Sequence, residues 1–217
     1  SIDQETSIAK INGISIAYVT AGEEENPPVL MIMGLVASHK VWGEKIVNGL
    51  IDDGYRVILF DNRDTGNSEK LDELGKPNLY WKYFLYSLGF GFGAPYTLED
   101  MADDGVGLLD HLQIDKAHII GASMGGMIAQ IIASKYPERT SSLVSLMSSP
   151  RIPKVSEISD KNQKNLRNME NVEAKSAQDY GFYPRALPRQ LTAIFKAGDR
   201  SDIVSNIRVP TLVLHGE

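Results

Sequence analysis

The sequence predicts an α/β fold: a mostly parallel sheet covered by helices on both faces, with an inserted helical cap. Three observations support this prediction. Short apolar runs that suit buried strands alternate along the chain with segments of helical spacing. One of these runs leads through a glycine-rich turn straight into a helix. With 217 residues, of which 42% are hydrophobic, the chain is long enough to bury one substantial core.

The individual elements follow from local patterns. Residues 8–11 and 14–20 flank Asn12-Gly13, a pair that adopts positive φ at low cost, and so form an antiparallel hairpin. The strand at 29–33 is a continuous apolar run, which is typical of a strand covered on both faces. Thr97 and Asp100 form a helix-capping pattern. The elements expected after the hairpin are a strand at 29–33, a helix over about 39–52, a strand at 55–60, a helix from 98 to about 111, a strand and helix around 117–136, and strands at 142–147 and 211–215.

One long segment differs from the rest of the chain. Residues 150–205 contain polar helix formers and no apolar strand run, and the core pattern returns after them. We therefore expect a core made of residues 1–149 and 206–217, with residues 150–205 inserted as a cap.

Composition and charge exclude several classes of function. A net charge of −6 leaves no broad basic face for nucleic acid and favours an uncharged small molecule as substrate. The absence of cysteine excludes disulfides, thiolate metal sites and a cysteine nucleophile. No motif for a metal or an organic cofactor is present, so neither is expected. The chain has no apolar run that could span a bilayer and no signal-peptide pattern, so a cytoplasmic location is expected, and nothing indicates the oligomeric state.

The most informative stretch is the glycine-rich turn around Ser123. The strand at 117–122 runs into Gly121-Ala122-Ser123-Met124-Gly125-Gly126 and then into a helix. In such an elbow the turn is so tight that Gly121 and Gly125 must lack side chains, and Ser123 presents its hydroxyl above the sheet. The alternative is that Ser123 merely caps the helix. A cap needs none of these glycines, so a nucleophilic serine is the favoured interpretation.

Three ordered motifs at strand ends carry a family resemblance. They are residues 121–126, residues 61–68 and residues 209–216, and together they resemble the α/β-hydrolase superfamily from the N-terminal hairpin to the last residue. Met33-Gly34 and Asp64 stand where many relatives have His-Gly and Gly, and both variants are similar to the methyl-esterase-like members.

The resemblance implies a reaction and a set of residues. It implies a serine hydrolase that cleaves a small or medium carboxylic ester through an acyl-enzyme intermediate on Ser123. The oxyanion donors would be the backbone N–H groups of Met124 and Leu35. A serine rather than an aspartate at the elbow argues against a dehalogenase or an epoxide hydrolase. Perhydrolysis and the cleavage of lactones, thioesters and C–C bonds stay open.

The base and acid that such a serine requires are not evident in the chain. His111, His118 and His215 are expected to be structural. His39 is expected to be a surface histidine at a helix start, and it is the only one expected near Ser123. Asp61 and Arg63 are expected to serve the turn that contains them.

In the family the acid and the histidine come after the strand that here ends near Glu217. That strand would also be left as an unpaired apolar edge. We therefore expect the sequence to be part of a longer protein.

The rival to the serine-hydrolase hypothesis is a catalytically silent scaffold that binds a ligand or partner in the cap cleft.

An aromatic-rich segment lies in the connection between the expected strand at 55–60 and the expected helix from 98 to about 111. Residues 80–93 contain seven aromatic side chains, a number that is unusual for a connection between elements. These side chains are candidates for an acyl pocket or a membrane contact. We expect most of them to form a local hydrophobic cluster that covers the core.

Overall fold

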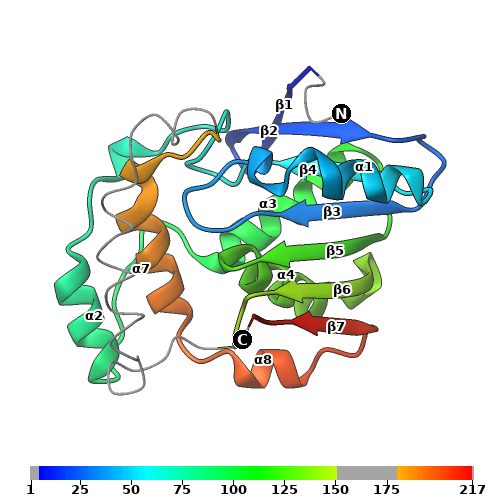
Figure 1. Cartoon of the computed structure of the whole chain (residues 1–217). Coiled ribbons are helices and arrows are strands. Elements are labelled where there is room, and N and C mark those ends of the chain that lie inside the picture. The colour runs from blue at the N-terminus through cyan, green and yellow to red at the C-terminus, as the bar shows by residue number, and fades with distance from the viewer. Residues whose placement is uncertain (1–4, 151–179, 217) are drawn as a thin grey trace.

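A seven-stranded sheet forms the centre of the molecule (Figure 1). The computed structural model describes residues 5–150 and 180–216. The strands lie in the order β1-β2-β4-β3-β5-β6-β7; β2 pairs antiparallel with β1 and β4, and all pairs from β4 to β7 are parallel. The strands are β1 Ser7–Ile11, β2 Ile14–Ala21, β3 Pro28–Ile32, β4 Arg56–Phe60, β5 Ala117–Ala122, β6 Thr140–Leu146 and β7 Thr211–Leu214. The predicted, mostly parallel sheet is confirmed.

Helices cover both faces of this sheet, as predicted (Figure 1). Strand residues alternate between two hydrophobic clusters, one packed against α1 and the other against α3 and α4. Short 3-10 turns join several of the elements. The helices are α1 Glu44–Asp52, α2 Leu79–Ser87, α3 Leu98–His111, α4 Met124–Lys135, α7 Leu187–Ala197 and α8 Ser201–Ser205, and the 3-10 turns are η1 His39–Trp42, η2 Asp72–Leu74, η3 Pro137–Arg139 and η6 Pro184–Ala186.

Two local predictions are confirmed by backbone geometry. Asn12 and Gly13 have φ of 51° and 81° and close the β1–β2 hairpin, in which Ile11 pairs with Ile14. Thr97 and Asp100 form a full capping box: the Thr97 side chain accepts from the Asp100 N–H at 3.1 Å, and the Asp100 carboxylate accepts from the Thr97 N–H at 2.8 Å.

The predicted helix over residues 39–52 is interrupted. It consists of η1 and α1, and Gly43 between them has φ of 75°. This left-handed conformation is open to glycine and ends the first turn before the second helix starts.

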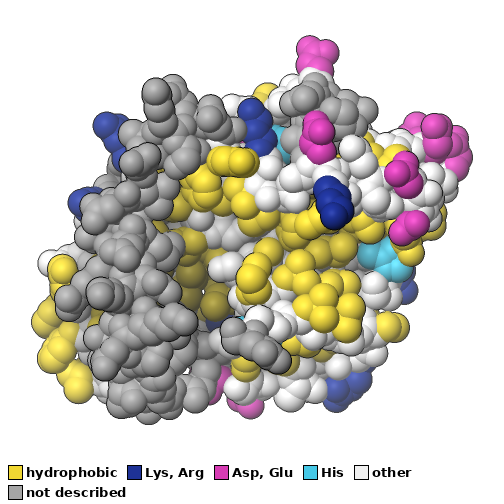
Figure 2. Space-filling view, viewed as in Figure 1, with side chains coloured by type: hydrophobic (Ala, Val, Ile, Leu, Met, Phe, Trp, Pro, Cys, Tyr) yellow, Lys and Arg dark blue, Asp and Glu magenta, His cyan; other side chains and the backbone are white. Residues whose placement is uncertain are grey.

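The expectation that the aromatic segment covers the core is wrong. Residues 79–87 form helix α2, which buries none of its side chains. Tyr80 is 92% exposed and Trp81 56% exposed, and the hydrophobic side chains at the lower left of Figure 2 lie where Figure 1 places α2. The aromatic rings of Tyr83 and Tyr86 pack instead against Phe195 of α7. The cluster therefore joins α2 to α7 rather than to the sheet.

The division into a core and a cap stays a prediction. Residues 151–179 lie outside the described residues, and residues 180–205 contain η6, α7 and α8.

Strand β7 lies at the edge of the sheet with all four residues exposed. It ends at Leu214, so His215 follows the strand instead of lying in it.

Candidate active site

Ser123 lies where strand β5 turns into helix α4. Its backbone has φ of 56° and ψ of −122°, a conformation that residues with side chains rarely adopt. The side chain of Ser123 is exposed and makes no capping hydrogen bond to the helix. The helix-capping alternative is therefore wrong, and the strained backbone points the hydroxyl to the surface instead.

The neighbouring glycines are required by close backbone contacts. A Cβ atom on Gly121 would lie 2.1 Å from the carbonyl oxygen of Gly125, and one on Gly125 would lie 2.0 Å from that of Ile32. A Cβ atom on Gly126 would lie 2.6 Å from the Cβ of Ser148. Helix α4 thus starts directly against the ends of β3 and β5, which leaves no room for side chains at this turn.

The loop after β3 runs past the same serine. A Cβ atom on Gly34 would lie 3.0 Å from the Cβ of Ser123 and 3.4 Å from its Oγ. Within the described residues, neither the Leu35 N–H nor the Met124 N–H donates a hydrogen bond. Met124 is the first residue of α4, whose N-terminus carries partial positive charge. The two backbone groups predicted as oxyanion donors are thus both free and both on segments adjacent to Ser123.

A segment far along the chain holds this loop. Val36 has φ of 52°, its N–H donates to Oε1 of Gln190 at 2.8 Å, and its carbonyl accepts from the Tyr183 N–H at 2.9 Å. The Ser38 hydroxyl donates to the carbonyl of Tyr180 at 2.5 Å. The sequence contains no motif around Gln190, so these contacts could not be predicted.

His39 is buried, which contradicts the prediction of a surface histidine. It is 2% exposed, and its Nδ1 lies 2.7 Å from Oδ1 of Asp61, which is 1% exposed. The same oxygen accepts the His39 N–H at 2.8 Å, and Oδ2 accepts the Asn67 N–H at 2.8 Å. A buried carboxylate requires such donors, and the histidine ring supplies one. Asp61 therefore organises the loops after β3 and β4, and no hydrogen bond joins the pair to Ser123 within the described residues.

The other histidines have partners away from Ser123. The ring of His111 packs edge-on against Tyr18, with centroids 5.8 Å apart. Nδ1 of His118 lies 2.7 Å from Oγ of Ser142. His215 is exposed. None of these contacts prepares a base for Ser123.

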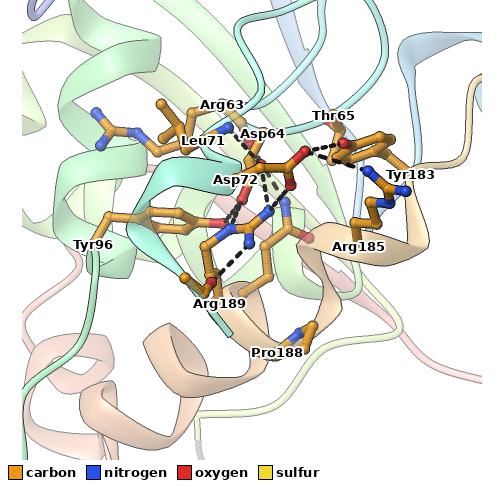
Figure 3. Close-up of polar contacts among 12 residues, drawn as sticks. Arg63, Asp64, Thr65, Leu71, Asp72, Tyr96, Tyr183, Arg185, Pro188 and Arg189 are labelled. Carbon is orange, nitrogen blue, oxygen red and sulfur yellow. Dashed lines mark hydrogen bonds and ion pairs between the residues drawn. The ribbon is translucent and has the colours of Figure 1, made fainter. Parts of the chain in front are cut away.

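Asp64 forms the centre of a buried polar network (Figure 3). It is 0% exposed and has φ of 73°, a conformation that explains why a glycine suits this position. Two Arg189 nitrogens donate to its carboxylate, Nε at 2.6 Å and Nη2 at 2.9 Å, and the Tyr96 hydroxyl donates at 2.7 Å. Burial, followed by the charge of Asp64, raises the pKa of Tyr96, and the hydrogen bonds with Asp64 raise the pKa of Arg189. The network fixes the start of α7 to the loop after β4.

Arg63 is held beside this network, as expected for a structural residue. Its Nε and Nη2 donate to the two oxygens of Asp104 in α3, at 2.6 and 2.8 Å. This bidentate pair occupies the guanidinium and ties the β4 loop to α3.

Neither a metal-binding cluster nor a membrane-spanning helix is present in the part of the chain that the structure describes. No group of three or more His, Asp or Glu side chains is arranged to hold a metal ion. No helix there is both long and apolar enough to cross a bilayer.

The chain is similar to proteins of a known family. Residues 27–193, more than half of the chain, match the family model described as alpha/beta hydrolase fold. The chain belongs to the α/β-hydrolase family, and it has esterase-like relatives.

Two curated relatives illustrate the similarity. The chain is 32% identical over 126 residues to rhodomycin D methylesterase DnrP of Streptomyces peucetius, a match that covers 58% of this chain and 36% of the relative. It is 29% identical over 131 residues to 3-oxoadipate enol-lactonase 2 of Acinetobacter baylyi, covering 60% of this chain and 40% of the relative. The matched region thus spans well under half of either relative.

A solved structure supports the fold. The enol-lactonase from Burkholderia xenovorans superposes with a TM-score of 0.71 at 21% identity, covering 97% of this chain and 81% of that structure. At this identity the similarity concerns the fold alone.

Proposed function

We propose that the protein is a serine hydrolase that cleaves a small or medium carboxylic ester through an acyl-enzyme intermediate on Ser123. The observation that carries the proposal is the exposed Ser123 hydroxyl on a strained turn, beside the N–H groups of Leu35 and Met124, which donate no hydrogen bond within the described residues. The similarity to a methylesterase and to an enol-lactonase supports ester chemistry. A small-molecule substrate, the absence of a nucleic-acid partner and a cytoplasmic location belong to the same proposal.

The proposed reaction uses the elbow in two steps. Oγ of Ser123 attacks the ester carbonyl while a histidine base takes its proton, and the N–H groups of Leu35 and Met124 stabilise the oxyanion. The alkoxide leaves with that proton as an alcohol, and water then attacks the acyl-enzyme to release the acid and regenerate the serine. By the family resemblance, the histidine and its carboxylate follow the strand that contains Leu214.

The proposal is tested by the Ser123 dependence of ester hydrolysis. The intact protein is assayed with p-nitrophenyl acetate and butyrate, methyl esters, a lactone and a thioester. Ser123→Ala is expected to lower kcat at least about a thousandfold, as removal of a nucleophile does in serine hydrolases. Ser148→Ala, which alters a buried serine against Gly126 behind the same turn, is the matched control and should retain activity. Equal rates for the wild type and Ser123→Ala would contradict the proposal.

One observation favours the rival function, a silent scaffold that binds a ligand. Among the described residues, no histidine forms a hydrogen bond with Ser123. A silent scaffold would hydrolyse none of the esters in the panel. The two functions are therefore separated by the same assay.

A further inference from the structure

The loop that passes Ser123 holds a strained residue. Val36 is β-branched and has φ of 52°, a conformation that costs such a residue about 1–3 kcal/mol and persists only when its surroundings enforce it. The bonds that enforce it are specific. The Ala37 N–H donates to the carbonyl of Gly34 at 3.4 Å, and Val36 is bonded through both its N–H and its carbonyl.

The bond to the Val36 N–H comes from a buried amide side chain. Gln190 is 0% exposed, and its Oε1 accepts the Val36 N–H at 2.8 Å. Its Nε2 donates to the carbonyl of Arg63 at 3.4 Å. This orientation leaves the Val36 N–H occupied and the preceding Leu35 N–H free. The contact with Gln190 thus determines which amide of the loop is available beside Ser123.

Gln190 is itself held in place by its neighbour. Arg189 donates to both carboxylate oxygens of Asp64, to Oδ1 of Asp72 at 2.9 Å and to the carbonyl of Gly75 at 2.9 Å (Figure 3). These bonds fix the first turn of α7, and the adjacent Gln190 extends to Val36 from that fixed point. Helix α7 is therefore mechanically connected to the loop beside the candidate nucleophile.

We propose that Gln190 is a positioning residue of the oxyanion hole. It contacts neither substrate nor the reacting atoms; its bond to the Val36 N–H fixes the Leu35–Val36 peptide. That peptide adjoins the Gly34–Leu35 peptide, which carries the Leu35 N–H, and so keeps this N–H directed at the developing oxyanion. The inference rests on the proposed function of Ser123 and extends it, because it makes the hole depend on a side chain of α7. Without the acceptor, the Val36 N–H would be buried and unpaired, and the peptide would be free to turn.

The test compares three variants of the intact protein. Gln190→Met keeps the volume but removes the acceptor, and we expect kcat to fall about tenfold to a hundredfold while KM changes less than about threefold, since complete loss of an oxyanion donor costs about 10²–10³. Gln190→Glu retains the acceptor oxygen and, protonated in this buried position, also a donor to the carbonyl of Arg63, so it should restore kcat to within a few-fold of the wild type. Thr192→Val is the matched control. Thr192 is equally buried on α7 but bonds only to the carbonyl of Pro188, so the change should leave kcat unaltered.

A second measurement does not depend on catalysis. Amide hydrogen exchange should show faster exchange of the Val36 N–H in Gln190→Met, and not in Gln190→Glu or Thr192→Val. Unchanged exchange at Val36, or equal losses of kcat in Gln190→Met and Thr192→Val, would overturn the inference. Failure of the proposed function has a different signature, a wild-type rate that Ser123→Ala does not lower, and it would overturn both.

Discussion

The two backbone segments that meet beside Ser123 are held in different ways. The elbow is fixed by glycines within five residues of the serine, whose missing side chains let β5, α4 and the end of β3 touch. The loop after β3 is fixed by Gln190, which lies 154 positions from the Val36 that it bonds. The comparison shows that one half of the candidate site is built by local geometry and the other by a distant helix.

Substitution at the elbow should have the largest effect. In Gly125→Ala, the new Cβ would lie 2.0 Å from the carbonyl oxygen of Ile32, and backbone atoms cannot move aside cheaply. We expect a loss of about 4–5 kcal/mol or more in the free energy of unfolding, measured by denaturant titration, or no folded protein. Gly49→Ala in α1 is the control, because nothing lies within 4 Å of its Cβ. It should stabilise the protein by up to about 1 kcal/mol, and equal effects of the two changes would contradict the packing argument.

The anchor of the distant helix should give the next largest effect. Arg189→Met leaves the Asp64 carboxylate buried with its ion pair broken, and we expect a loss of about 3–5 kcal/mol in denaturant unfolding. Adding Asp64→Gly removes that charge, and it also relieves the backbone strain of a non-glycine residue at a φ of 73°. The double variant should therefore be more stable than Arg189→Met alone. Additive losses in this cycle would show that the two residues are not coupled.

Backbone strain at Ser123 predicts a smaller effect of opposite sign. Ser123→Gly replaces a side-chain residue at φ of 56° and ψ of −122° by one that adopts this conformation freely. We expect stabilisation of about 1–3 kcal/mol, seen as a rise in Tm of roughly 2–4 °C per kcal/mol, together with loss of ester hydrolysis. Ser148→Gly is a suitable control. A lower Tm for Ser123→Gly would mean that the turn is not strained.

The smallest effect concerns the hydrogen bond between Tyr183 and Asp72 at acid pH. The hydroxyl of Tyr183 donates to Asp72, and this bond, with that of Arg189, lowers the pKa of the Asp72 carboxyl below its ordinary value. A lowered folded-state pKa stabilises the protein above the unfolded value of about 4, and the contribution is lost as pH falls through the folded value. Tyr183→Phe should therefore lower Tm modestly at pH 6 and by less as the pH falls through the folded-state pKa of Asp72. A difference in Tm that did not shrink with falling pH would contradict this assignment.

The local half of the fold and of the site could be predicted from the sequence. The hairpin at Asn12-Gly13, the capping box at Thr97 and the elbow at Ser123 each depend on residues within a few positions of one another. Strands β3 and β4 could be predicted because they are continuous apolar runs, which have to be covered on both faces.

The rest depends on contacts between distant parts of the chain. The burial of His39 could not be predicted because its reason is the carboxylate of Asp61, 22 positions away, which needs a donor inside the protein. Helix α2 packs two tyrosines on Phe195 of α7 instead of on the sheet, and Gln190 bonds Val36 from a turn that Arg189 fixes. No motif marks these pairs, since each residue type is ordinary on its own.

The central claim is that Ser123 is a nucleophile, and covalent labelling tests it most directly. The intact protein and its Ser123→Ala variant are treated with a fluorophosphonate probe, and each is measured by intact mass and peptide mapping. We expect one adduct on the wild type, located on Ser123, and none on the variant. An unlabelled wild type, or an adduct that persists in Ser123→Ala, would contradict it.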